Sequence, residues 1–181
     1  MNRSKPWIAA ILGMVFGAIL MVGYLAHADR LRPAKPDVLV SLAQTLDAQH
    51  KQVDVLLKQG DVAGAIAVLE DARTLTWPSR EQAGDTAVVL RHDTYGRLLR
   101  LRLDHPSISP QDPSAMLTTL TEGLGQDYKQ IDTNLFTARL LAIHGELLVS
   151  QGQDEQALTA YEEALTMNRQ LLTNALAGSQ P

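Results

Sequence analysis

Apolar residues recur every three to four positions along most of this chain, which is the spacing of an amphipathic helix. No segment shows a convincing two-residue alternation of the kind that is typical of a strand. The pattern predicts an all-α fold in which six helices form three antiparallel hairpins within residues 37–178. The expected helices run from Asp37 to Gly60, from Asp61 to Trp77, from Ser79 to about Leu103, from Asp112 to Gly123 or Gly125, from Asp132 to Ser150, and from Asp154 to about Leu176.

Several helix starts carry their own signal. Ser79 and Gln82 have the spacing of a capping box, in which each side chain bonds the backbone of the other residue. Asp112 precedes Pro113, so an N-cap stands directly before a proline in the first helical turn. Asp37 and Asp132 are expected to cap the first and fifth helices, and Pro106 and Pro110 mark the loop between the third and fourth.

The first 28 residues read as a membrane anchor or a signal peptide. Arg3 and Lys5 precede an uncharged apolar run that extends from Trp7 to Ala26. As a helix, the stretch from Trp7 to Tyr24 would span roughly 26 Å, close to the thickness of a bilayer's hydrocarbon core. The two aromatic residues would then lie at the two membrane interfaces. The interpretation that we favour is a retained single-pass anchor.

Cleavage is the alternative. Ala26-His27-Ala28 has the form of a signal-peptidase site, although the apolar run is longer than the usual central region of about 7–15 residues. Residues 29–36, which contain Pro33 and Pro36, form a short stiff linker. Basic residues flank the run on both sides and so leave its orientation open. We expect an inner-membrane protein with its domain facing the periplasm, or a secreted periplasmic protein if the chain is cut after Ala28.

Small residues lie on one face of this apolar run. Gly13 and Gly17 form a GxxxG pair, and Ala9 extends the small surface by one turn. Such a surface lets a second helix approach closely in lipid. A chance GxxxG is also common, so helix packing through these residues and no packing role remain equal alternatives.

Composition narrows the possible functions. The net charge of the whole chain is −4, and beyond residue 28 there are 14 basic against 20 acidic residues. An acidic domain lacks the basic surface that nucleic-acid binding needs. The chain has no cysteine, which excludes disulfides and thiolate ligands. We therefore expect neither nucleic acid nor a small-molecule substrate as a partner.

Motifs for chemistry are also missing from the sequence. The histidines show no metal-ligand spacing, and no phosphate loop or nucleophile elbow occurs. His92 and Asp93 are neighbours in a predicted helix, so their side chains should point apart and not act as a base and its orienting group. We expect no enzyme activity, no metal and no cofactor, although a site invisible to motifs stays an alternative.

The last two predicted helices carry a more specific pattern. Gly145 lies midway along the first of them and Gly152 at the turn, while Ala157, Tyr161 and Ala164 share a face of the second. This arrangement resembles the tetratricopeptide repeat (TPR), a helical hairpin in which small and large residues interlock. The resemblance implies a stack of hairpins that binds other proteins and carries no chemistry. The departures are His144, where the repeat usually has leucine, and the absence of a closing proline.

The resemblance weakens towards the N-terminus. The first hairpin keeps Gly60, Ala65, Leu69 and Ala72, but Val53 replaces the mid-helix glycine. The two turn glycines are so far apart that the middle unit must hold an insertion of about 24 residues, given a repeat of about 34. A plain helical bundle is the alternative fold.

In a TPR stack the first helix of each hairpin lines the concave surface, which is where a partner binds. Arg97 and Arg100 lie one turn apart there and could grip a carboxylate together. The alternative, which we favour, is an ordinary i,i+4 pair between Asp93 and Arg97. The expected lining residues are Asp47, His50, Asp54 and Lys58 from the first unit, Asp93, Arg97 and Arg100 from the second, and Arg139, Ala142 and Glu146 from the third.

The sequence thus predicts a membrane-tethered, TPR-like adaptor that binds another protein in the periplasm or an equivalent space. It resembles the single-anchor TPR proteins of the bacterial envelope. The alternative is a structural accessory subunit that the N-terminal helix holds permanently in a larger membrane complex. Neither the partner nor the oligomeric state follows from the sequence.

Overall fold

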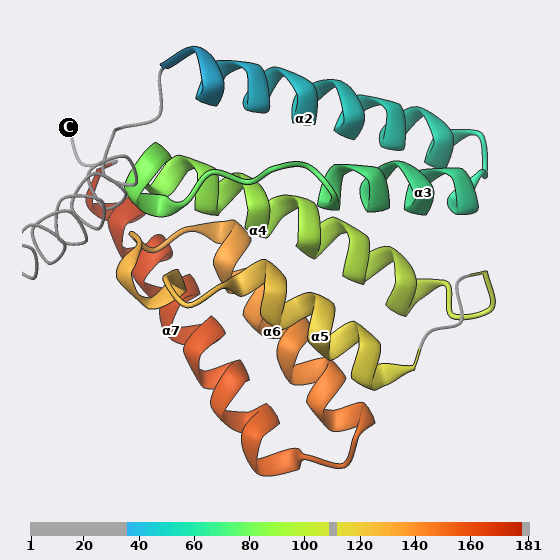
Figure 1. The fold of residues 1–181 in the computed structure, drawn as a ribbon. Helices are drawn as coiled ribbons and strands as arrows, with labels where there is room; N and C mark the ends of the chain where they lie inside the picture. Colours follow the sequence, from blue (N-terminus) through green and yellow to red (C-terminus); the bar gives the residue numbers. More distant parts are fainter. Residues whose placement is uncertain (1–35, 109–111, 179–181) are drawn as a thin grey trace, which may run out of the picture.

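The computed structural model describes residues 36–108 and 112–178, and these residues form α-helices and one short 3-10 helix, with no strand among them. The predicted all-α class is confirmed. Figure 1 shows the helices in chain order from α2 to α7. Their bounds are α2 Pro36–Lys58, α3 Val62–Arg73, α4 Arg80–Asp104, α5 Pro113–Leu124, η1 Tyr128–Gln130, α6 Leu135–Ser150 and α7 Asp154–Ala177.

The predictions for the N-terminal run, including the small surface of Ala9, Gly13 and Gly17, lie outside the described residues. Among the helices from α2 to α7, none combines the length and the apolar character that crossing a membrane requires.

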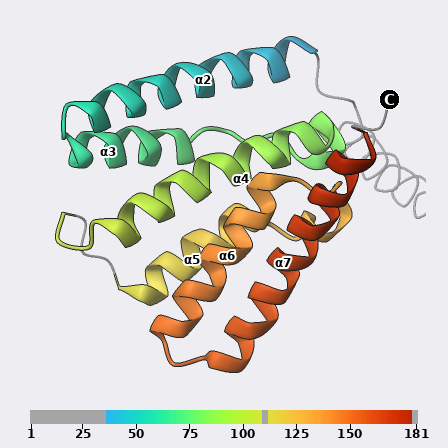
Figure 2. The same ribbon diagram turned by 180° about the vertical axis from the view of Figure 1, so that it is seen from behind.

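The six α-helices pair as three hairpins: α2 with α3, α4 with α5, and α6 with α7. In Figures 1 and 2, each helix runs back alongside the one before it, and the series continues from α2 at the top to α7 at the bottom. The contact between α6 and α7 is the most extensive, and each hairpin also packs its second helix on the first helix of the next pair. The apolar faces are therefore buried between helices that are neighbours in the chain.

The predicted helix starts are mostly confirmed. Ser79 and Gln82 form the capping box, Asp112 caps α5 ahead of Pro113, and the Asp61 carboxylate accepts the backbone N–H of Gly64 at 2.8 Å. Each of these bonds satisfies a backbone donor that the first turn of a helix leaves without a partner.

Two predicted caps were wrong. The residue that caps α6 is Asn134, whose side-chain oxygen accepts the backbone N–H of Thr137 at 2.9 Å, and not Asp132. Helix α2 begins at Pro36, so Asp37 lies in its first turn and is not the N-cap. Proline suits that turn because the N–H that it lacks would have no helical partner there.

The first and last hairpins share the same turn. Gln59 and Gly60 follow the end of α2, and Gln151 and Gly152 follow the end of α6, with φ angles of +79° and +72° at the two glycines. In both turns the residue after the glycine donates its N–H to the carbonyl five positions earlier, at 2.9 Å. This is a Schellman closure, which needs a left-handed residue that glycine provides without strain.

The middle hairpin differs from the other two. Helix α4 has 25 residues, against 23 in α2 and 16 in α6, and its helical backbone is interrupted at Gly84, where φ is +68°. The loop of residues 105–112 replaces the three-residue turn of the other hairpins, and a further segment with η1 separates α5 from α6.

At two glycines, the ring of a tyrosine from the other helix of the hairpin packs directly against the backbone. A Cβ atom at Gly145 would lie 2.6 Å from Cε1 of Tyr161, and one at Gly123 would lie 2.5 Å from Cδ1 of Tyr95. The α6–α7 contact is the one that the sequence predicted. In the middle pair the roles are reversed, because the tyrosine comes from the first helix and the glycine from the second. Hydrogen in place of a side chain lets each pair of helices interlock closely.

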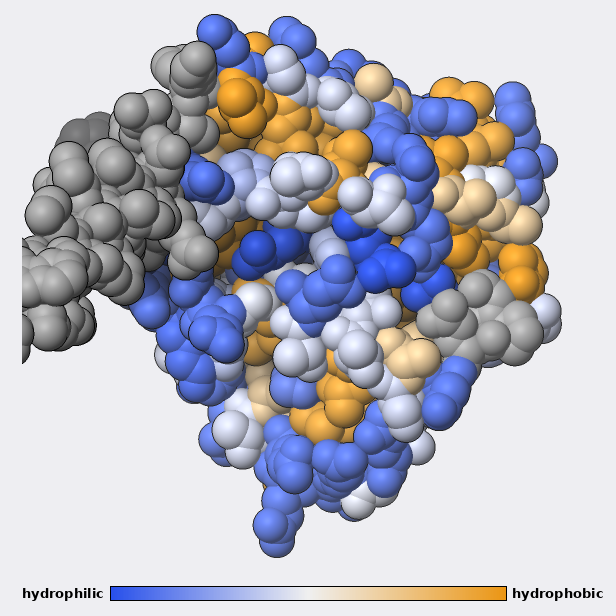
Figure 3. Space-filling model, in the orientation of Figure 1, coloured by the Kyte–Doolittle hydropathy of each residue, from blue (hydrophilic) through white to orange (hydrophobic). Residues whose placement is uncertain are grey.

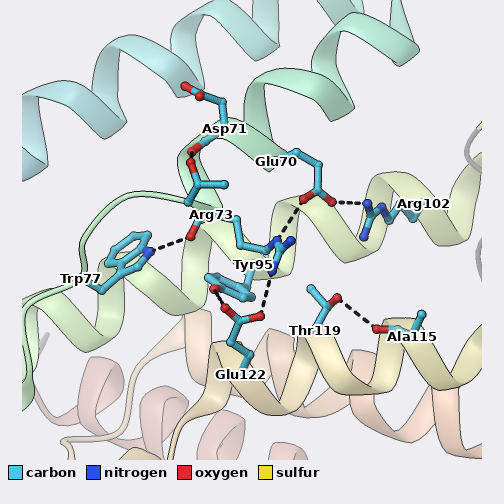
Figure 4. A network of polar contacts seen from close by, with 10 residues as sticks. Glu70, Asp71, Arg73, Trp77, Tyr95, Arg102, Ala115, Thr119 and Glu122 are labelled. Carbon is cyan, nitrogen blue, oxygen red and sulfur yellow. Dashed lines mark hydrogen bonds and ion pairs between the residues drawn. The ribbon is translucent and has the colours of Figure 1, made fainter.

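Tyr95 also joins three helices through its hydroxyl group. It donates to Glu122 of α5 at 3.0 Å, and Glu122 binds Arg73 of α3 at 2.9 Å. Glu70 bridges Arg73 and the buried Arg102 of α4 (Figure 4). Figure 3 shows strongly hydrophilic side chains gathered across the middle of this side of the molecule. Since Arg102 is buried, removing Glu70 would leave a charge without its partner.

His92 ties α4 to the two helices that follow. It is fully buried, and its Nε2 lies 3.0 Å from the carbonyl oxygen of Leu124, which can only accept a hydrogen bond. Nε2 therefore carries the proton, and Nδ1 accepts the hydroxyl of Thr137 at 2.7 Å. Burial lowers the pKa of His92 to about 4. The hydrogen bond to the Leu124 carbonyl opposes this shift, and the charge of Arg91 adds a smaller lowering.

We expect the domain to lose stability as the pH falls from about 6.5 to about 4. Over this interval His92 becomes protonated in the unfolded chain but stays neutral in the folded chain. The contribution reaches roughly 3 kcal/mol once the pH is below both pKa values. Urea unfolding of the protein at pH 7 and pH 4.5, compared with His92→Gln, measures it. An identical pH dependence in the variant would contradict this assignment.

A second prediction concerns the packing of α6 on α7. Gly145→Ala should destabilise the domain by about 1–3 kcal/mol because the methyl group overlaps the Tyr161 ring. Gly96→Ala is the matched control, since a Cβ there meets only Cδ of Arg139 at 3.8 Å. That change should stabilise the helix by up to about 1 kcal/mol. Thermal unfolding compares the two variants, and Tyr161→Ala should abolish the cost of Gly145→Ala. Equal melting temperatures for the two alanine variants would contradict the interlock.

Candidate functional site

The first helices of the three hairpins lie side by side. The backbone of α4 runs close to both α2 and α6, whereas α5 meets α3 and α7 mainly through single side chains such as Glu122 and Leu117. One side of the molecule is therefore built from α2, α4 and α6, and we refer to it as the α2–α4–α6 face. Direct contacts on this face join seven of the residues that the sequence predicted to line it, in two groups. One group contains His50, Asp54, Asp93, Arg97 and Arg139, and the other is the pair of Arg100 and Glu146.

Between α2 and α4 the contacts centre on Asp93 and Arg97. Arg97 lies 3.3 Å from the carboxylate of Asp54 and 3.5 Å from that of Asp93. Asp93 also lies 3.5 Å from Nδ1 of His50. The i,i+4 pair between Asp93 and Arg97 is thus present, but it belongs to a group that spans two helices.

Between α4 and α6 the principal contact is a forked pair. Arg100 places its two terminal nitrogens 2.9 Å and 2.5 Å from the two oxygens of Glu146. Hydrogen bonding to Glu146 is the main cause that raises the pKa of Arg100. Arg139 reaches across from α6 to Asp93 at 3.6 Å. Arg97 and Arg100 therefore bind different carboxylates of their own chain, and they do not bind one carboxylate together.

These charges are held loosely. The Arg97, Arg100 and Arg139 side chains are one third or more exposed, so each pair contributes about 0–1 kcal/mol to stability. Oδ1 of Asp93 and Nε of Arg97 are buried and lie 3.5 Å apart, so they form an ion pair without a hydrogen bond. What the face offers to a binding partner is therefore the exposed part of its three arginine side chains.

An open pocket of about 400 Å³ lies beside these charges. Its apolar walls come from α2 and α4, and its rim is formed by arginines of α4 and α6. A volume of this size falls within the range of about 300–1,000 Å³ that is common for binding pockets. The residues that line it are Val53, Leu57, Gly96, Arg97, Arg100, Leu101 and Arg139.

Gly96 keeps this pocket open. Unlike Gly145 and Gly123, it has room for a Cβ atom, so packing alone does not require a glycine. Glycine inside a helix costs about 1 kcal/mol relative to alanine. From the sequence, Tyr95 and Gly96 were assigned to the repeat pattern and not to a pocket, although the place of Gly96 between predicted lining residues was a signal for this role.

His50 lies at the inner edge of the face. Its Nδ1 faces Asp93 and its Nε2 lies 3.3 Å from the Thr94 hydroxyl. Burial, followed by the charge of Arg97, lowers the pKa of His50, although Asp93 opposes this. The imidazole is therefore mainly neutral near pH 7, and the face carries arginine and carboxylate charges without a histidine cation.

Other predicted residues take less part. Asp47 pairs with Lys51 at 2.6 Å on the exposed side of α2. Lys58 is exposed and Ala142 is half-buried. His92 and Asp93 do point apart, as expected, because His92 is committed to Leu124 and Thr137. Among the described residues, no three acidic or histidine side chains converge in a way that could hold a metal ion.

Comparison with protein-family models, with curated proteins and with solved structures finds no match to this chain.

Proposed function

We propose that this protein is a membrane-tethered, TPR-like adaptor that binds another protein on its α2–α4–α6 face, in the periplasm or an equivalent extracytoplasmic space. The observation that carries the proposal is the assembly of this face. Side chains separated by up to about a hundred residues in the chain meet around one pocket that the fold leaves open. Three features support the proposal: the order of the helix stack, the chemistry of the α2–α4–α6 face and the N-terminal apolar run.

The order of contacts supports a TPR-like stack. Each helix packs on the next one in the chain, and the backbone of α4 runs close to the other two first helices, α2 and α6. A stack of this kind has one side lined by first helices only. The shared turns at Gly60 and Gly152 and the ring of Tyr161 against Gly145 agree with the repeat pattern.

The chemistry of the face supports binding to protein. Charges on the face are balanced and already paired, so it offers no strong field of one sign to nucleic acid or to a charged metabolite. A peptide segment can exchange with these weak surface pairs at little cost, since each contributes so little to stability. The apolar wall beneath the arginines would receive an aliphatic or aromatic side chain, and the partly exposed arginine side chains of the rim would bond polar groups beside it.

The tether rests on the uncharged run from Trp7 to Ala26. A retained helix of this length would hold the domain at the membrane surface through the linker of residues 29–36. A permanent accessory subunit is the second candidate, and its support is the GxxxG pair of Gly13 and Gly17 within this run. The two candidates differ in whether partners co-purify at fixed stoichiometry.

We expect Gly96→Leu to abolish partner binding because the side chain enters the pocket, and thermal unfolding checks that the variant still folds. The control is Thr118→Leu, which adds the same side chain on the exposed surface of α5, outside this face. Tagged full-length protein is purified in mild detergent, and mass spectrometry quantifies the proteins that accompany the wild type and each variant. Arg97→Ala with Arg100→Ala should also weaken binding.

Retention of the same partners by Gly96→Leu and by wild type would contradict the proposed site. Loss of partners from Thr118→Leu as well would show that the variants act through a different surface. A fixed set of membrane subunits that survives every change on the α2–α4–α6 face would favour the accessory subunit.

A retained anchor makes a prediction about processing. Full-length protein should stay in the membrane pellet after an alkaline carbonate wash, and its N-terminal peptide should begin near Met1. Replacing Ala28 with Trp, which blocks a signal-peptidase site, should change neither result. A mature N-terminus at Asp29 that disappears in this variant, with the wild type in the soluble periplasmic fraction, would show cleavage instead.

A further inference from the structure

Helix α7 carries a stripe of exposed apolar side chains along most of its length. Leu158, Leu165 and Leu172 recur at intervals of seven residues, with exposed fractions of 63%, 48% and 61%. Tyr161 and Leu176 fall on the same side of the helix. Single exposed leucines are ordinary, but a row of them over several turns indicates a surface that packs against something.

Within the part of the chain that the structure describes, α7 packs on its neighbours through a different side. Helix α7 packs on α6 through Ala157, Ala160 and Ala164, which are buried and lie on a different side of the helix. The short alanines bring the two helices close together, and the leucines project elsewhere. Tyr161 lies between the two sides, because its ring covers Gly145 while 36% of the residue remains exposed.

Charge along α7 is divided between its two halves. Asp154, Glu155 and Glu162 lie in the first half, and Arg169 in the second is the only basic residue of the helix, while Glu163 pairs with Lys129 on the other side of α7. A parallel second helix of the same kind would place these acids against one another. An antiparallel one would place the acidic half of each helix against the half that carries Arg169, and would also oppose the two helix dipoles favourably.

The stripe is symmetric about its middle leucine. If two α7 helices cross at Leu165 in antiparallel orientation, Leu158 of one copy lies opposite Leu172 of the other, and Leu165 lies opposite itself. Tyr161 then faces Arg169 of the second copy, which permits a cation–π contact. A surface that complements itself in this way is what a two-fold dimer requires.

We propose that two copies of this protein associate through antiparallel α7 helices, with the two-fold axis at Leu165. The interface is separate from the α2–α4–α6 face, so that a dimer would present two partner-binding faces. It is small, because it is made by a single pair of helices, and we expect it to be reversible.

Cysteine cross-linking tests both the contact and its direction, because the chain has no cysteine of its own. Full-length variants are oxidised with copper phenanthroline in mild detergent, and disulfide dimers are measured on non-reducing gels. Leu165→Cys should cross-link to itself. Leu158→Cys and Leu172→Cys should each stay monomeric alone and cross-link when the two are mixed. Thr166→Cys, next to Leu165 but off the stripe, is the control and should not cross-link.

A disruptive change completes the test. Adding Leu165→Glu to the mixed Leu158→Cys and Leu172→Cys proteins should lower the yield of cross-linked dimer by about tenfold or more, whereas Thr166→Glu should leave it within about twofold. Melting temperatures of both variants should match the wild type, since both positions are exposed.

Three results would overturn the proposal. Self-cross-linking of Leu158→Cys, Leu165→Cys and Leu172→Cys alike would mean a parallel pair. Yields no higher than that of Thr166→Cys would mean that α7 does not bind a second copy. A cross-link from Leu165→Cys to a different protein in cell membranes, without the self-cross-link, would assign the stripe to that protein.

Discussion

The close approach of helices at a tyrosine and a glycine is the contact on which the rest of this structure depends. Tyr95 can lie against Gly123 only because no side chain occupies that position, and the same holds for Tyr161 and Gly145. Each contact replaces a weak general attraction between two helices with a specific fit that fixes how they cross. Tyr95 adds a hydroxyl that holds Glu122, and through it Arg73 of α3, so that one side chain locates three helices. Its ring also meets Trp77 edge to face at 6.5 Å.

The consequence for function follows from geometry. Because α5 packs onto α4 at Tyr95, and α7 onto α6 at Tyr161, the other side of α4 lies between α2 and α6, and the three helices form one surface. The buried polar groups divide accordingly. His92 and Arg91 point to the end of α5, where they bond the carbonyls of Leu124 and Gly123, while Asp93 points to the α2–α4–α6 face. His92 and Arg91 therefore bond polar groups of the interior, whereas Asp93 and the weaker ion pairs around it lie on the α2–α4–α6 face.

Much of this could be predicted from sequence because local signals determine it. Caps such as Ser79 with Gln82, and turn glycines such as Gly60 and Gly152, act within a few residues and need no knowledge of the fold. Helical spacing then placed the residues of the α2–α4–α6 face correctly on their helices. Contacts between distant segments could not be predicted in the same way. The reversed pairing of Tyr95 with Gly123, the fork of Arg100 on Glu146 and the pocket at Gly96 depend on how helices cross, which apolar spacing does not specify. Asp132 failed as a cap because two polar residues close together, Asp132 and Asn134, were both chemically suitable, and the path of the chain after η1 selected Asn134.

The central claim is that a protein partner binds where α2, α4 and α6 meet. Photo-cross-linking in living cells tests it most directly, with p-benzoylphenylalanine placed at Asp54 or Arg139 on the rim of this face and at Thr118 or Thr173 elsewhere. The account predicts one defined adduct from both rim positions, its loss when the pocket is filled, and no such adduct from the other two positions. Equal adducts from all four positions, or adducts from Thr118 and Thr173 alone, would contradict it.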